Sequence, residues 1–125
     1  MLKFLSFGSG SSGNCYILFT GADCLMIDCG VGIRTLKKHF YNYGLQMSMI
    51  HHILITHDHA DHVKSVGSIS GDLQLPVYAT DGTLQGIRNN WCVRRKIDTK
   101  LTHTINKGEE VQLGEFKVVA FDVPH

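Results

Sequence analysis

The sequence predicts an α/β domain, or part of one, with a mixed β-sheet and helices covering one face. Strand-like and helix-like segments alternate along most of the chain, and short turns join them. The chain has 125 residues, of which 43% are hydrophobic and 18% are charged, so it can bury a core and is not a disordered polyelectrolyte. Its net charge of +1 gives no overall attraction for nucleic acid or an anionic membrane.

The first part of the chain is predicted to form strands joined by turns, then a helix. An alternating pattern predicts a strand over Leu2–Phe7, and a Gly/Ser loop follows over 8–13. A hairpin is expected from Cys15–Thr20 and Cys24–Asp28, joined by Gly21-Ala22-Asp23. A helix ending at Gly44 is predicted from apolar residues at helical spacing: Ile33, Leu36, Phe40 and Tyr43.

The second part continues the alternation and then turns to strands alone. Apolar, β-branched residues over Ile50–Ile55 predict a buried strand, and a short helix from Val63 to Ile69 is expected to end at Gly71. A strand over Pro76–Ala79 precedes a helix that Thr80 or Asp81 caps and that runs to about Trp91. A meander of three strands is predicted last: Leu101–Ile105, Glu110–Leu113 and Phe116–Val123.

The cysteines and the chain ends indicate compartment and extent. Four cysteines without a CxxC pair, in a domain able to build a core, predict reduced thiols in a cytoplasmic protein. No signal peptide is recognisable, and no apolar run nears the roughly 20 residues of a membrane span. The sequence stops at His125, directly after an apolar strand, which predicts a truncated domain whose exposed sheet face favours self-association.

The main chemical feature is the segment Thr56-His57-Asp58-His59-Ala60-Asp61-His62. Imidazole nitrogens and carboxylate oxygens are ligands for zinc, manganese and iron, and a solvated loop seldom concentrates them in this way. His57 and His59 can project the same way from an extended exit of a strand and bind one ion. Asp61 and His62 follow after the chain has turned, so they can face a second ion.

This segment is the HxHxDH signature of the metallo-β-lactamase fold superfamily, which the chain resembles. The resemblance implies half of an αββα sandwich, with residues 1–125 as the N-terminal part of a single domain. It implies two divalent metal ions, zinc or manganese or else iron, with ligands from His57, His59, Asp61, His62 and His125. Asp28, at the end of a strand, matches a family aspartate that supports the ligand histidines. The metal-bridging aspartate and the last histidine of the family have no counterpart in these residues.

A Gly/Ser loop gives a second, narrower resemblance. Phe7-Gly8-Ser9-Gly10-Ser11-Ser12-Gly13-Asn14 and the final Phe-Asp-Val-Pro-His resemble the YycJ/WalJ-type branch, cytoplasmic bacterial proteins regarded as 5′-to-3′ DNA exonucleases. Such a loop either cradles a phosphate through Ser9, Ser11, Ser12 and Asn14 or is a flexible turn. A strand follows it and no GxxxxGK[ST] motif is present, which argues against a dinucleotide site or a P-loop.

Other polar residues are less informative. Five basic residues surround Trp91 and either contact a nucleic-acid backbone or form a solvated surface: Arg88, Arg94, Arg95, Lys96 and Lys100. Four histidines lack ligand spacing and are expected to be structural or exposed: His39, His51, His52 and His103. The cysteines are expected to be small buried hydrophobic residues without a nucleophilic role: Cys15, Cys24, Cys29 and Cys92.

Three functions remain open from these residues. The first is a phosphodiesterase acting as a DNA exonuclease, in which Asp61 positions or deprotonates the attacking water. The second is a hydrolase of small esters, thioesters or lactams on the same fold. The third is a metal-binding module without catalysis, because the second metal would lack part of its ligand set in this length of chain.

Overall fold

A six-stranded mixed sheet forms the centre of the computed structural model, which describes residues 1–121. In the order β1-β2-β3-β4-β5-β6, the strands are Lys3–Gly8, Cys15–Phe19, Cys24–Ile27, His52–Leu54, Val77–Ala79 and Thr102–Thr104. The first three strands pair antiparallel, whereas β3 to β6 are parallel. The predicted α/β class with a mixed sheet is therefore confirmed.

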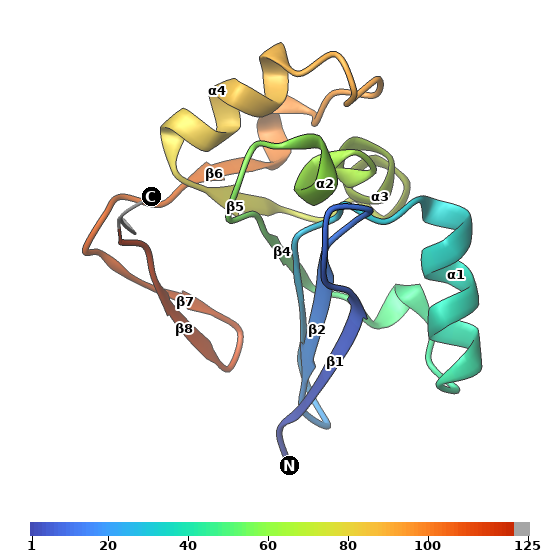
Figure 1. Cartoon of the computed structure of the whole chain (residues 1–125). Helices are drawn as coiled ribbons and strands as arrows, with labels where there is room; N and C mark the ends of the chain where they lie inside the picture. Colours follow the sequence, from blue (N-terminus) through green and yellow to red (C-terminus); the bar gives the residue numbers. More distant parts are fainter. Residues whose placement is uncertain (122–125) are drawn as a thin grey trace.

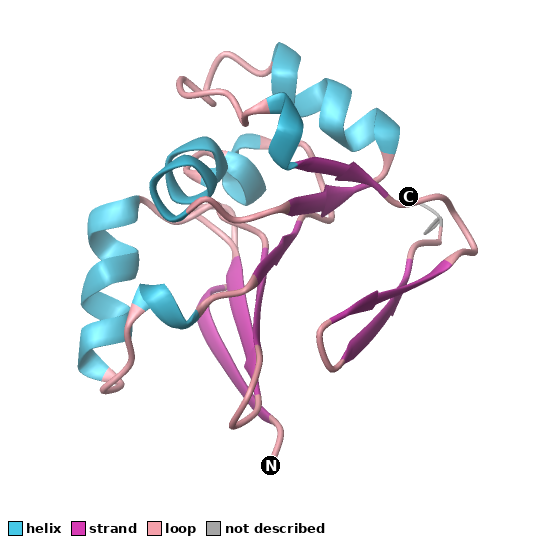
Figure 2. Ribbon diagram, turned by 180° about the vertical axis from the view of Figure 1, so that it is seen from behind, coloured by secondary structure: helices cyan, strands magenta, loops and turns pink. Residues whose placement is uncertain are grey.

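The helices lie on one side of this sheet, and a separate hairpin lies on the other (Figures 1 and 2). The helices are α1 (Ile33–Asn42), α2 (Ala60–Val63), α3 (Val66–Leu73) and α4 (Asp81–Asn89). Short 3-10 turns cover Met47–Met49 and Thr99–Leu101, and the hairpin consists of β7 (Glu110–Leu113) and β8 (Phe116–Val119). None of the helices in the described part of the chain is long and apolar enough to cross a membrane.

Several predicted elements differ from the structure. The single helix predicted from Val63 to Ile69 is divided, because α2 ends at Val63 and α3 begins at Val66. Gly71 does not end its helix, because α3 continues to Leu73 and stops before Gln74, whose φ of 53° is left-handed. Gly71 lies inside the helix, where its lack of a side chain makes room for Arg95. A Cβ at this position would collide with the Arg95 guanidinium. The predicted meander is also wrong, because α4 carries the chain over the sheet and β6 pairs parallel with β5.

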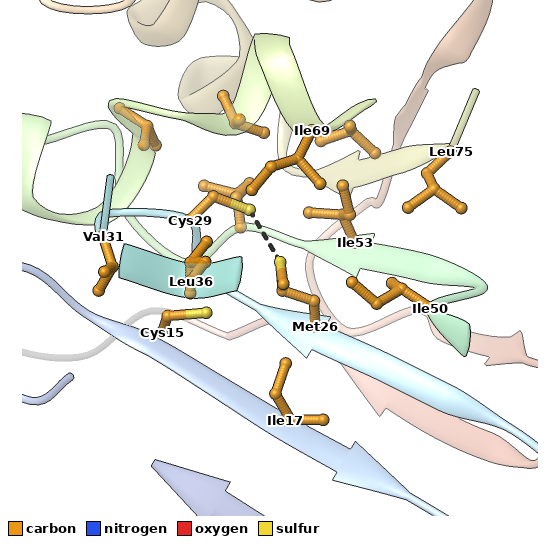
Figure 3. Close-up of a cluster of buried hydrophobic side chains, with 14 of the residues drawn as sticks. Cys15, Ile17, Met26, Cys29, Val31, Leu36, Ile50, Ile53, Ile69 and Leu75 are labelled. Atoms are coloured by element: carbon orange, nitrogen blue, oxygen red, sulfur yellow. Dashed lines mark hydrogen bonds between the residues drawn. The ribbon is translucent and has the colours of Figure 1, made fainter. Parts of the chain in front are cut away.

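The core lies between the sheet and the helices (Figure 3). Met26 and Ile53 from the parallel strands lie in one cluster with Leu36 and Ile69 from the helices, and all four are fully buried. The Cys29 thiol contacts the Met26 sulfur at 3.4 Å.

The prediction of small buried cysteines is confirmed for Cys15, Cys24 and Cys29 but not for Cys92, which is only partly buried. All four are free, and three of them are buried. Burial raises the pKa of Cys15 and of Cys24 to about 12, so both thiols stay neutral at physiological pH. These cysteines therefore serve as packing residues rather than nucleophiles.

Candidate metal centre

The His-rich segment leaves the sheet at the carboxyl end of β4. The backbone of His59 is extended and α2 begins at Ala60, so Asp61 and His62 follow the turn that the sequence predicts. Asp28 stands beside them, directly after the parallel neighbour β3. Because parallel strands bring their carboxyl ends to one edge of a sheet, residues far apart in sequence meet here.

Asp28 is at the centre of the hydrogen-bond network of this site. Its side chain is almost fully buried, and its two oxygens accept three hydrogen bonds. The Thr56 amide donates to Oδ1 at 2.8 Å and the Thr56 hydroxyl to Oδ2 at 2.7 Å, while His62 Nδ1 lies 2.8 Å from Oδ2. The backbone of Asp28 is left-handed, with φ of 64°, a conformation that aspartate and asparagine tolerate better than most residues.

These hydrogen bonds fix the tautomers of two histidines. The Thr56 hydroxyl donates to Asp28, so it accepts the proton of His57 Nδ1, which lies 2.8 Å away. His62 likewise directs its Nδ1 proton at Asp28. Both imidazoles are then left with a bare Nε2, the form that binds a metal ion.

Together these residues form a group able to hold a metal ion. One ligand atom from each of Asp28, His57 and His62 lies within 4.8 Å of the other two. The two imidazoles of this group are donors that suit zinc and related ions. Because three donors already occupy the Asp28 oxygens, we assign Asp28 to orienting the imidazoles.

The remaining sequence-predicted ligands lie around this group. Asp61 Oδ2 is 3.8 Å from His62 Nε2, so the carboxylate faces the nitrogen that His62 leaves bare. The His59 side chain is 73% exposed, with its ring centroid 6.1 Å from that of His57 and its Nε2 3.9 Å from Asp58 Oδ1. Among the described residues, His59 does not belong to the group formed by Asp28, His57 and His62. The division into two ion sites stays a prediction.

Asn14 joins the Gly/Ser loop to the metal centre. Its backbone N–H donates to the Asp61 carbonyl at 2.7 Å, and its buried side-chain Nδ2 lies 3.1 Å from that carbonyl and 3.3 Å from Asp61 Oδ2. The same amide closes the loop on Gly10, donating at 2.9 Å and accepting at 3.1 Å, and accepts from the Tyr16 hydroxyl at 3.2 Å. Asn14 is thus an anchor for Asp61. Phosphate contacts by the exposed Ser9, Ser11 and Ser12, and by Asn14, stay predictions.

The loop after β3 packs against the His-rich segment 56–62, called the metal loop below, and leaves no room for a side chain between them. The Cys29 N–H donates to the His62 carbonyl at 2.7 Å, and the Gly30 N–H donates to the Asn14 carbonyl at 2.9 Å. A Cβ on Gly30 would collide with the Asp61 carbonyl. The position of Asp61 and His62 is therefore set by main-chain contact with this loop.

Sequence reasoning missed three contributors to the site. Thr56 adjoins the His-rich segment but was given no role, and neither the anchoring role of Asn14 nor the packing role of Gly30 follows from residue type. Only the adjacency of Thr56 to the histidines could have suggested one of them. His125, the predicted further ligand, lies outside the described residues, so its role stays a prediction.

A cavity of about 820 Å³ opens beside the metal loop. His57, Asp58 and His59 line one wall, the start of α4 contributes Thr80 and Thr83, and the end of the hairpin closes another side. A ligand in this cavity would face the histidines directly.

The comparisons with known proteins agree with this geometry. Residues 24–125 match the family described as the beta-lactamase superfamily domain. The chain belongs to the metallo-β-lactamase superfamily. A solved subclass B3 metallo-β-lactamase of Bradyrhizobium japonicum, BJP-1, superposes with a TM-score of 0.76 at 18% identity, covering 97% of this chain and 49% of that one. The expected half of the superfamily fold is confirmed.

Two of the relatives carry exonuclease names. Exodeoxyribonuclease WalJ of Streptococcus pneumoniae is 28% identical over 123 residues, which are 98% of this chain and 45% of the relative. Exodeoxyribonuclease YycJ of Bacillus anthracis is 29% identical over 124 residues, or 99% and 46% of the two chains. The chain therefore spans about half the length of these relatives, and the resemblance to the YycJ/WalJ branch is confirmed.

Proposed function

We propose that the chain provides the metal-binding half of a phosphodiesterase that degrades DNA as a 5′-to-3′ exonuclease. The observation that carries this proposal is the pair of imidazoles held by Asp28, His62 directly and His57 through the Thr56 hydroxyl, with the Asp61 carboxylate facing His62 Nε2. The superfamily is one of metal-dependent hydrolases, and the WalJ and YycJ relatives support DNA as the substrate.

The chain's residues divide the work in this proposal. His57, His59, Asp61 and His62 hold two divalent ions, zinc or manganese or else iron, and His125 adds a ligand for the first. When bound, such ions lower the pKa of water and neutralise charge on phosphoryl oxygens. Asp61 orients the attacking water and accepts its proton, while Asn14 holds the Asp61 carboxylate in place. Asp28 keeps His57 and His62 in the tautomers that bind metal.

Metal binding is tested first and without reference to activity. We expect metal-free protein dialysed against zinc or manganese to retain metal, and His57→Ala to lose most of it. A chain that retains no more metal than His57→Ala would remove the basis of the proposal.

Catalysis is tested in the protein at its full natural length. We expect Asp61→Asn and His59→Ala each to lower nucleotide release from end-labelled DNA by about a thousandfold or more, since each removes a ligand that stabilises the transition state. His103→Ala is the matched control, because His103 is exposed on β6 and stacks on Tyr78 instead of facing the metal loop. Near-normal activity of Asp61→Asn would exclude a two-metal mechanism.

We also propose a cytoplasmic location, where the four free cysteines stay reduced. Labelling the thiols in freshly lysed cells tests this, and extensive oxidation in intact cells would contradict it.

A further inference from the structure

The loop that follows α4 presents a large aromatic side chain to solvent. Trp91 is the one tryptophan of the sequence, and it is 83% exposed. From the sequence, the basic residues around it could equally belong to a nucleic-acid contact or a solvated surface.

The loop is held rigidly on both sides of Trp91. The Asn90 side chain accepts the Cys92 N–H at 2.9 Å, and the Asn90 carbonyl accepts the Val93 N–H at 3.1 Å and the Lys96 ammonium at 2.7 Å. Val93, two residues after Trp91, is buried and anchors the loop in the core. Trp91 is thus exposed on an ordered loop, which lowers the entropy cost of binding through it.

The same loop is fastened to the metal loop. Asn90 Nδ2 donates to the carbonyl of Asp58 at 2.9 Å, and Asp58 lies between His57 and His59. The Asp58 side chain also packs on Gly86 of α4, where a Cβ would displace it. A ligand on Trp91 is therefore held next to the loop that carries the metal ligands.

The charge around Trp91 is positive and only partly neutralised. Arg95 pairs with Asp72 at 2.6 Å, and Lys100 pairs with Asp98 at 3.9 Å. Arg88 and Arg94 are exposed, and within residues 1–121 their side chains have no hydrogen-bond or ion-pair partner. Each of these arginines lies three residues from Trp91 in the chain, so one short exposed segment carries an aromatic face and two guanidinium groups, a combination that complements a nucleobase flanked by phosphates.

We propose that Trp91, Arg88 and Arg94 form a platform that binds single-stranded DNA, with a base stacked on Trp91 and phosphates at the two arginines. The choice of DNA rests on the proposed function. The platform would hold the strand beside the metal loop.

Trp91 itself reports on the proposed contact. Because residues 1–125 hold no other tryptophan, the intrinsic fluorescence of this chain excited at the indole follows this one side chain. We expect oligo-dT to quench that fluorescence saturably in EDTA, where no metal-dependent cleavage takes place. The titration therefore measures binding whether or not the protein hydrolyses DNA, so its failure is separate from failure of the proposed function.

Variants of Trp91 and Arg94 test the platform by the anisotropy of labelled oligo-dT. Loss of a stacked base predicts about tenfold or more weaker binding by Trp91→Ala, with Trp91→Phe in between. Arg94→Ala should weaken binding and reduce the dependence of log affinity on log salt by about 0.7, the value for one phosphate contact on a single strand. Tyr41→Ala is the matched control, since Tyr41 is 82% exposed but lies on α1.

Three results would overturn the proposal. They are an unquenched indole at saturating DNA, a Trp91→Ala variant that binds like Tyr41→Ala, and tighter binding of oligo-U than of oligo-dT, which would make RNA the ligand. Circular dichroism of each variant shows whether it is folded, and the exposed position of Trp91 predicts that Trp91→Ala folds normally.

Discussion

Strand β3 has an aspartate at each end, and the two aspartates differ sharply in their surroundings. Asp23 immediately precedes the strand and Asp28 immediately follows it. Each contacts a histidine, since Asp23 lies 3.3 Å from His51, just before β4, and Asp28 lies 2.8 Å from His62, in α2. Each also accepts a main-chain N–H, from Glu115 to Asp23 and from Thr56 to Asp28.

Burial separates the two ends. The Asp28 side chain is 3% exposed and its histidine 18%, whereas the Asp23 side chain is 16% exposed and its histidine 51%. A polar contact in the interior costs much more to break than one that water can replace. The Asp28 end is therefore a buried site whose polar atoms are hydrogen-bonded, whereas the Asp23 end is a more exposed contact that fastens the β7–β8 hairpin to the sheet.

The largest expected difference between the ends comes from glycine substitutions. We expect Gly30→Ala to lower the free energy of unfolding by about 3 kcal/mol or more, because its Cβ meets the main chain at Asp61, which has no room to move. Gly114→Ala at the Asp23 end should cost about 1 kcal/mol, since its φ of 61° is left-handed but its Cβ meets only the Asp23 side chain, which can rotate away.

Urea denaturation of both variants measures the difference. Gly32→Ala is the nearby control, because a Cβ there meets nothing within 4 Å. Equal losses for Gly30→Ala and Gly114→Ala would mean that the metal end is no more tightly packed than the hairpin end.

The next largest difference is expected for removal of each carboxylate charge. Asp28→Asn keeps the size and tolerates the left-handed backbone, but its amide group loses an acceptor for either Thr56 or His62. We expect a loss of about 2–3 kcal/mol in stability and about 10- to 100-fold weaker zinc binding. Asp23→Asn should cost less than about 1 kcal/mol, because the His51 side chain that Asp23 contacts is 51% exposed and water can replace the contact.

Denaturation and zinc titration of the two variants test this pair of expectations together. Unchanged zinc affinity in Asp28→Asn would show that Asp28 does not orient the ligand histidines. A large zinc effect from Asp23→Asn would instead indicate that the metal site is elsewhere.

The contrast also shows what the sequence could predict. Short strands of apolar residues and a dense run of histidines indicate the α/β class and the metal loop, because periodicity and ligand type are local properties. Nothing local distinguishes Asp28 from Asp23, since both stand at strand ends and only the family resemblance favoured Asp28. The roles of Asn14 and Thr56 depend on strand order and loop packing, which bring together residues distant in sequence.

Strand pairing at the end of the sheet was unpredictable for a related reason. The segments at 101–105, 110–113 and 116–123 look alike as short strands, but the α4 crossover sets β6 parallel to β5 and leaves β7 and β8 as a hairpin. Which strand joins which sheet is decided by connection geometry rather than by the residues of the strand itself.

The smallest expected effect concerns His52, at the Asp23 end of the sheet. Its buried Nδ1 has no hydrogen-bond partner among the described residues, and its ring packs on Tyr78. Burial lowers the pKa of His52 below its usual 6.5, with His51 acting in the same direction and the charge of Asp23 opposing both. As pH falls through 6.5, His52 becomes protonated in the unfolded chain while it is still neutral in the folded chain. This residue therefore lowers the stability of the fold toward acid pH and raises it toward neutral pH.

His52→Phe removes this titration while keeping a ring against Tyr78 and losing no hydrogen bond at Nδ1. We expect the variant to lose less stability than the wild-type chain when urea denaturation is repeated at acid instead of neutral pH, by a margin smaller than the effects above. Parallel losses in the two proteins would mean that His52 is protonated as easily in the folded chain as in the unfolded one. The Asp23 carboxylate would then stabilise the His52 charge enough to cancel the cost of burial, and this end of β3 would resemble the Asp28 end more closely than its hydrogen bonds indicate.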